Sequence, residues 1–165
     1  LAIAVFNDKA TGITIAPEPS LPEFVRAYKT SAIGVTEAGS GDWTTAMGTA
    51  GLVGFNKTKV LGAVSNIVLF KRDPGGYAHA RTYSRRLLYD TIDYLDNGLM
   101  DFSVGATALT LSGTAGSPVF GLYGKGAAAF TDGTLTTLSP GTTEAMTFLI
   151  KWSRSTGAWS APERP

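Results

Sequence analysis

Apolar residues recur at helical spacing in two neighbouring stretches near the middle of the chain. Over residues 58–72 they return about every 3.6 positions, which predicts a helix that stops before Asp73-Pro74. A second amphipathic helix is predicted over Ala80–Leu95, and Asn97-Gly98 is typical of a helix end. Because glycines between them allow a sharp reversal, the pattern predicts a helical hairpin over about 58–97.

The second helix is expected to separate an apolar face from a charged one. The apolar face contains Tyr83, Leu87, Leu88, Thr91 and Leu95, and the charged positions are Arg81, Arg85, Arg86, Asp90 and Asp93. We expect the apolar face to pack into the core.

The region before the hairpin has shorter and less regular signals. Two strands, Ile3–Phe6 and Ile13–Ala16, are predicted as a hairpin around a polar turn, with prolines ending the pairing. Ser20 and Glu23 have the spacing of a capping box, which predicts a short helix over Leu21–Lys29. Residues 30–54 show no sustained period and are interpreted as mostly loop.

After Gly98 the pattern changes to short Thr-, Val-, Leu- and Phe-containing stretches between glycines, which indicates strands. The predicted strands are Phe102–Leu111, Val119–Tyr123, Ala127–Phe130, Thr134–Leu138, Ala145–Trp152 and Gly157–Trp159. The last two form a hairpin signal whose aromatic residues can pair across the strands.

These elements predict an α+β fold in which the helical hairpin packs on a C-terminal antiparallel β-sheet or sandwich. Residues 1–98 form a loop-rich segment with short strands and the helical hairpin. Residues 99–165 form a β-rich region, and the two parts are expected to make one compact unit.

Charge and hydropathy exclude several classes of partner. Lys and Arg number 14 against 13 Asp and Glu, so no global field favours nucleic acid or an anionic membrane. Every apolar run is too short to span a bilayer. The chain begins at Leu1 without a signal-peptide pattern, which is typical of a processed, trimmed or fragment end.

The chain contains no cysteine, which removes disulfides, thiolate metal sites, thiol nucleophiles and thioether attachment of haem. Its 20 glycines and many Thr, Ser and Ala residues resemble the composition of β-rich surface and extracellular proteins. The common hydrolase and nucleotide-binding motifs do not occur.

His79 is the one histidine of the chain and follows the turn Asp73–Tyr77. A single imidazole excludes a metal site with two histidines, but it leaves one axial ligand or one acid/base group. The alternative is a histidine that is merely hydrogen-bonded or partly exposed.

Arg81 and Arg85 are four residues apart on the second helix, where both can face one carboxylate-bearing group. The alternative is pairing with nearby aspartates or with solvent. Four aspartates over residues 90–101 lack the ligand pattern of a calcium loop. The three tryptophans are more typical of core or cross-strand pairs than of a carbohydrate platform.

Two runs of this chain resemble a segment of large extracellular multihaem c-type cytochromes of metal-reducing bacteria. The first is Asn66–His79 (NIVLFKRDPGGYAH) and the second is Tyr83–Gly98 (YSRRLLYDTIDYLDNG), together about a fifth of the chain. Those cytochromes carry a comparable acidic-Pro-Gly-x-Tyr-x-His turn, followed by a helix with two basic residues, Leu, an aromatic residue and spaced aspartates.

The resemblance implies a role in extracellular electron transfer, in some members as filaments. On that analogy His79 is an axial haem ligand, Arg81 and Arg85 lie near haem propionates, and Tyr77 belongs to the same site. Iron ligation needs a neutral imidazole whose other N–H is held, and the turn Asp73–Tyr77 is placed to supply that partner.

The chain departs from the family because it has no CxxCH motif. His79 could therefore ligate only a haem held by another polypeptide or by a segment outside this sequence. The leading hypothesis is a non-enzymatic accessory or assembly domain of an extracellular multihaem cytochrome, whose partners are that cytochrome or like subunits.

Two other classes stay open. One is a purely structural surface protein, such as a filament, coat or adhesin subunit without a cofactor, in which the hairpin only packs. The other is an enzyme such as a glycosidase, which needs two carboxylates facing one cleft.

Overall fold

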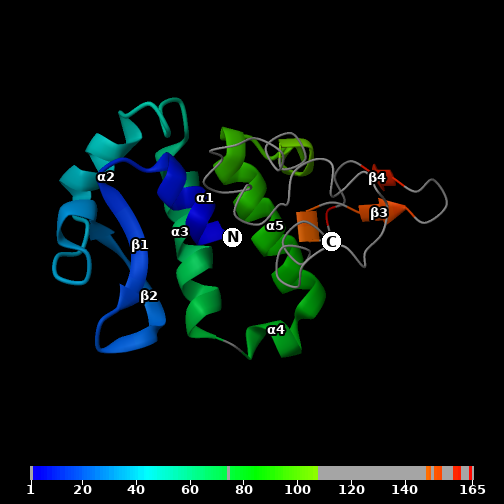
Figure 1. Ribbon diagram of the computed structural model, residues 1–165, viewed down its shortest axis with the longest axis horizontal. Helices are drawn as coiled ribbons and strands as arrows, with labels where there is room; N and C mark the ends of the chain where they lie inside the picture. The colour runs from blue at the N-terminus through cyan, green and yellow to red at the C-terminus, as the bar shows by residue number, and fades with distance from the viewer. Residues whose placement is uncertain are drawn as a thin grey trace. The chain divides into compact units, whose positions relative to one another are not determined.

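The computed structural model describes residues 2–73, 75–107, 148–149, 151–153, 158–160 and 164. The chain divides into two compact units, Ala2–Leu99 and Met100–Pro165. The first unit contains five helices, a 3-10 turn and a two-stranded sheet within its described residues. Figure 1 shows their order along the chain.

The chain begins with a helix, α1 (Ala2–Lys9), where a strand over Ile3–Phe6 was predicted, so that prediction is wrong. Its buried residues are Ala2, Val5 and Phe6, which is helical spacing. A short apolar run does not distinguish a buried strand from a buried helix, and here the packing partners decide. The helix packs against β1 and α5.

The two strands of the first unit are β1 (Ile13–Glu18) and β2 (Leu21–Lys29), which pair antiparallel. The strand predicted over Ile13–Ala16 is confirmed, but its partner is β2 rather than residues 3–6. The helix predicted over Leu21–Lys29 is wrong, because this segment supplies the backbone hydrogen bonds that β1 needs. Aromatic and β-branched residues also suit it to a strand.

Residues 30–54 contain more structure than the predicted loop. A 3-10 turn, η1 (Thr30–Ala32), follows β2, and α2 (Ser40–Met47) begins where the Asp42 carboxylate accepts a hydrogen bond of 2.8 Å from the Gly39 N–H. The ring of Trp43 on α2 lies 5.9 Å from that of Phe6, measured between centroids. The prediction missed α2 because it is short and lacks an apolar stripe.

The helical hairpin is confirmed as α3 (Lys57–Arg72) and α5 (Arg81–Asn97), with a separate turn, α4 (Gly76–His79), between them. Gly98 ends α5 in the left-handed conformation (φ 85°), with the Phe55 ring against the position that a side chain would take. The two long helices pack against each other, and α3 also packs on β2 (Figure 1).

The α+β class is therefore confirmed, but the sheet beneath the helices is N-terminal rather than C-terminal. The core of the first unit lies between that sheet and the helices and includes Val5, Phe6, Ile13, Ile15, Val25, Leu52, Val60, Ile67, Tyr89, Ile92 and Leu95. The predicted layout is wrong because Leu21–Lys29, for which a helix is predicted, forms one of the two strands of this sheet.

In the second unit the described residues include β3 (Lys151–Ser153) and β4 (Ala158–Ser160). These strands pair antiparallel with Trp152 opposite Trp159, which confirms the predicted terminal hairpin. Residues 104–107 are helical, which contradicts that part of the predicted strand Phe102–Leu111, and residues 148–149 are helical within Ala145–Trp152. The predicted strands Val119–Tyr123, Ala127–Phe130 and Thr134–Leu138 lie outside the described residues.

Among the helices that the structure describes, none combines the length and the apolar character needed to cross a membrane.

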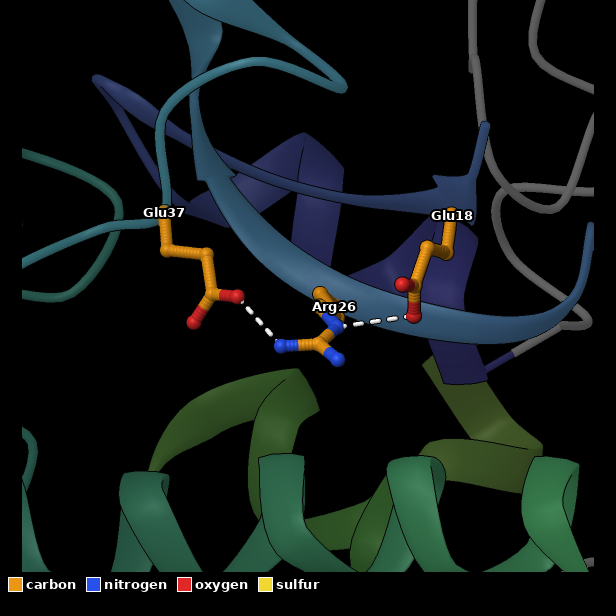
Figure 2. Close-up of polar contacts among 3 residues, drawn as sticks. All are labelled: Glu18, Arg26 and Glu37. Atoms are coloured by element: carbon orange, nitrogen blue, oxygen red, sulfur yellow. Dashed lines mark hydrogen bonds and ion pairs between the residues drawn. The ribbon is translucent and has the colours of Figure 1, made fainter. Parts of the chain in front are cut away.

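Arg26 on β2 lies between two carboxylates (Figure 2). Its Nε donates to Glu18 Oε2 at 2.8 Å, and its Nη1 donates to Glu37 Oε1. The hydrogen bond to Glu18 has the largest effect, followed by that to Glu37, and both raise the pKa of Arg26 above its ordinary value. Glu37 also forms a β-bridge with Tyr28, so the guanidinium ties the β-hairpin to the segment that follows it.

Replacing Arg26 by Met removes both ion pairs and keeps an apolar stem. We expect a lower Tm, and the difference should narrow as NaCl is added because exposed pairs are screened. Because the pKa of Arg26 is raised, the stability that its ion pairs add is fully present below the ordinary pKa of arginine. This stability is lost as the pH rises through the raised pKa of the folded protein. A difference that does not change with salt would contradict the ionic origin.

Gly51 lies where the chain passes the end of α1. A Cβ at this position would be 2.0 Å from the Lys9 carbonyl oxygen, so backbone must move to accept it. We expect Gly51→Ala to lower the free energy of unfolding by about 1–3 kcal/mol, as overpacking does. The measurement is urea unfolding.

The matched control is Gly62→Ala on the exposed side of α3, where no atom lies within 4 Å of the added Cβ. This change should stabilise the protein by about 0.5–1 kcal/mol, because alanine favours the helix interior. Equal effects of the two substitutions would show that the approach of Gly51 to Lys9 does not matter.

Candidate functional site

The predicted site lies where the helical hairpin reverses, and one polar contact sets how its two helices align. The Asn66 Nδ2 on α3 lies 3.1 Å from the Thr91 Oγ1 on α5. The Thr91 hydroxyl donates to the Leu87 carbonyl at 2.7 Å, so it accepts from Asn66. This pair places Asn66 and Thr91 at the same level of the antiparallel helices.

The reversal begins at Asp73, whose N–H donates to the Leu69 carbonyl and closes α3. Its carboxylate Oδ1 accepts a hydrogen bond of 2.9 Å from the Gly76 N–H. A Cβ on Gly76 would lie 2.9 Å from the Asp73 Oδ2, so a glycine lets the carboxylate approach the first residue of α4. Asp73 thereby connects the end of α3 with the start of α4.

Ser84 connects α4 with α5. Its side chain is buried, and its Oγ donates to the Gly76 carbonyl at 3.0 Å. The same carbonyl accepts the Ala80 N–H at 3.1 Å. The first residue of α4 is thus held through its N–H by Asp73 and through its carbonyl by Ser84. The sequence did not indicate this role of Ser84, because an isolated serine in a helix has no distinctive pattern.

His79 is the last residue of α4, and Ala80 separates it from α5. The sequence predicts His79 after the turn Asp73–Tyr77 and before the helix that begins at Ala80, and the structure adds a separate helical turn at this point. The backbone of Tyr77 and His79 belongs to the described part of the structure, whereas their side chains lie outside it. Iron ligation by His79 and participation of Tyr77 stay predictions.

Arg81 and Arg85 lie on the first turns of α5, directly after Ala80. Arg81 is exposed and Arg85 is half-buried, and both make interactions within the chain. Arg81 follows His79 by two residues, at the junction between α4 and α5. The predicted contact of the two arginines with haem propionates stays a prediction.

The burial of α5 differs from the predicted single apolar face. Tyr83 is 67% exposed, although it was assigned to the buried face, and Asp93 is 1% exposed, although it was assigned to the charged one. Residues 91–96 are all buried, so the C-terminal half of α5 is covered on every side. Helical periodicity reports one buried face and does not anticipate a fully covered helix.

Two further basic residues, Lys71 and Arg72, end α3 and lie at the same end of the hairpin as the arginines of α5. The candidate site predicted from the sequence includes only arginines that follow the histidine. The predicted hairpin also implies that Lys71 and Arg72 lie near them, because its reversal brings residues 71–72 and 81–86 to one end (Figure 1).

Within the residues that the structure describes, no group of three or more His, Asp or Glu residues could hold a metal ion. Since the whole chain contains one histidine and no cysteine, it can offer one imidazole ligand to a haem and no thioether attachment. These residues fit a histidine ligand supplied to a c-type haem that is attached elsewhere.

Comparison with known proteins finds local similarity to two bacterial cytochromes. A stretch of 47 residues is 49% identical to the C-type polyheme cytochrome OmcC of Geobacter sulfurreducens and covers 28% of this chain. A stretch of 58 residues is 45% identical to the C-type polyheme cytochrome OmcB of the same species and covers 34% of this chain. Part of the chain is related to polyheme cytochromes.

The matched stretches are small parts of those relatives, 6% of OmcC and 8% of OmcB. No protein-family model matches the chain. No solved structure matches it either. The similarity therefore supports the predicted relation to these cytochromes and leaves the predicted accessory role as a proposal.

Replacing Ser84 by Ala tests how α4 is held. The change removes the hydroxyl donor to Gly76, and we expect a loss of about 0.5–1.5 kcal/mol in the free energy of unfolding. Amide exchange at Ala80 should become faster, because the turn that its N–H closes is no longer tied to α5.

Ser65→Ala is the matched control, since the Ser65 hydroxyl donates to the Leu61 carbonyl on the exposed side of α3. This substitution should change stability by less than about 0.5 kcal/mol. If exchange at Ala80 is the same in both variants, Ser84 does not hold α4.

Proposed function

We propose that this chain acts in electron transfer at the cell surface or outside the cell, as a haem-free part or partner of a polyhaem c-type cytochrome. The observation that carries the proposal is the local identity of 45–49% to polyheme cytochromes. The chain contributes structure and recognition, and every covalently attached haem must belong to residues outside this sequence because the chain contains no cysteine.

The residues of α4 and α5 supply the contact with such a haem. His79 would offer an imidazole nitrogen to the iron, and Arg81 and Arg85 would face the propionates. The haem, when bound, supplies reversible one-electron transfer. Hydrogen bonds of Gly76 with Asp73 and Ser84 hold the first residue of α4, the helical turn that ends at His79.

The same arrangement limits what the chain can do. His79 would hold the iron of a c-type haem, whose porphyrin must be attached to another polypeptide or to another part of a longer one. An assembly role follows from this limit, because a haem ligated by His79 would join the chain to the polypeptide that carries the haem.

The first test asks whether the chain is joined to haem at all. Protein is purified from its native source with antibody against the 165-residue chain, and intact mass and reduced-minus-oxidised spectra are recorded. We expect c-type haem bands, carried either by a continuous polypeptide or by a co-purifying one. Material without any Soret absorbance contradicts the proposal and favours a structural surface protein without a cofactor.

The second test addresses His79 within that haem-containing material. His79→Ala should remove an axial ligand and convert one haem from low spin to high spin. His79→Met should keep that haem low-spin and raise its reduction potential. Thr82→Ala, an exposed neighbour, should leave both readouts unchanged. If magnetic circular dichroism shows the same spin states in all variants, His79 is not a ligand.

A further inference from the structure

The charge of this chain is concentrated at one end of the helical hairpin. Residues 71–86 carry five basic side chains and one acidic side chain, a formal charge of +4, whereas the whole chain carries +1. The other residues together therefore carry −3. Residues 71–86 are thus the part of the sequence with the largest excess of positive charge.

The helices bring these basic residues together. Lys71 comes five residues after Asn66, and Arg86 comes five residues before Thr91, the residue that Asn66 contacts. At 1.5 Å of rise per residue, both lie about 7.5 Å beyond that contact, at the same level of the antiparallel pair. Lys71, Arg72, Arg81 and Arg86 are exposed. We call these four residues with Arg85 the basic end.

The placement of these arginines does not help the helix to form. The N-terminus of a helix carries partial positive charge and favours acidic side chains. The first turn of α5 has no acidic residue, and its last turn has no basic residue, so the charges are arranged against the helix dipole. Positions that depart from a stabilising pattern are where a functional role is expected.

The residue types match carboxylates better than a lipid surface. Four of the seven arginines of the chain lie in the basic end, and guanidinium groups bind carboxylates in a planar, two-pronged geometry. A membrane-binding helix needs a continuous exposed apolar face. The exposed large apolar residues near this end are Leu69 and Tyr83, while Tyr89, Ile92 and Leu95 of α5 are buried.

The arginines of α5 also interact within the chain. Each guanidinium has five N–H donors, more than a single carboxylate engages. An internal contact thus orients the group and is compatible with a further carboxylate.

We propose that the basic end is a docking surface for an acidic polypeptide, recognised through clustered Asp and Glu side chains. Its attraction is long-ranged and depends on salt. This recognition does not require His79 or a haem, and it can be tested at Lys71, Arg72 and Arg86, which are not part of the proposed haem contact.

The test uses the full chain with soluble poly-L-glutamate as the probe, measured by isothermal titration calorimetry over a salt series. The variant is Lys71→Gln with Arg86→Gln, neither of which belongs to the haem contact. We expect affinity to fall roughly threefold to tenfold, as for two exposed ion pairs. Lys71→Gln with Arg72→Gln is a second pair for the same surface, also outside the haem contact, if the first does not fold.

The matched control is Lys57→Gln with Lys59→Gln at the opposite end of α3, which removes the same charge. The affinity of this variant should stay within about twofold of the wild type. Equal losses in both double variants would show attraction by net charge alone and overturn the proposal. Absence of binding to polyglutamate, or binding only to vesicles of phosphatidylcholine and phosphatidylglycerol, would also overturn it.

Discussion

The first unit depends on the packing of α1, which connects β1 with α5 while α3 packs directly on β2. Val5 and Phe6 are buried, and the helix packs against both β1 and α5. Its polar residues satisfy backbone groups on both sides. The Asn7 amide pairs with the N–H and the carbonyl of Ile15, and the Lys9 Nζ lies 2.5 Å from the Asp96 carbonyl oxygen. Lys9 thus places a cation at the C-terminus of α5, where the helix dipole favours it.

The parts of this fold that could be predicted are those whose sequence has a long period or a specific end signal. The helices α3 and α5 have both, and Gly98 ends α5 as its sequence indicates. The elements α1 and β2 could not be predicted, because short apolar segments fit a strand or a helix about equally well. Both conformations depend on β1. The strand β2 supplies hydrogen-bond partners along one edge of β1, and Asn7 of α1 supplies them at the other edge, at Ile15.

The candidate site was predictable as a location and less so in its construction. The sequence pattern identified a turn with one histidine before a basic helix, and the hairpin confirms that geometry. The separate turn α4, the hydrogen bond from its Gly76 N–H to Asp73 and the one that it accepts from Ser84 have no signal in the sequence. These contacts are local, so they can hold α4 without any haem. What His79 contacts outside this chain depends on a second molecule or segment, and the sequence of this chain does not encode that contact.

The two proposed roles of the hairpin end act over different distances, which gives them an order. Charges at the basic end act over roughly one Debye length, about 8 Å at physiological salt, before any surfaces touch. Ligation by a histidine acts only at bonding distance. Because α4 connects the basic residues that end α3 with those that begin α5, an acidic partner that binds both groups would lie near α4. Attraction would then orient the encounter, and α4 would determine what contact follows.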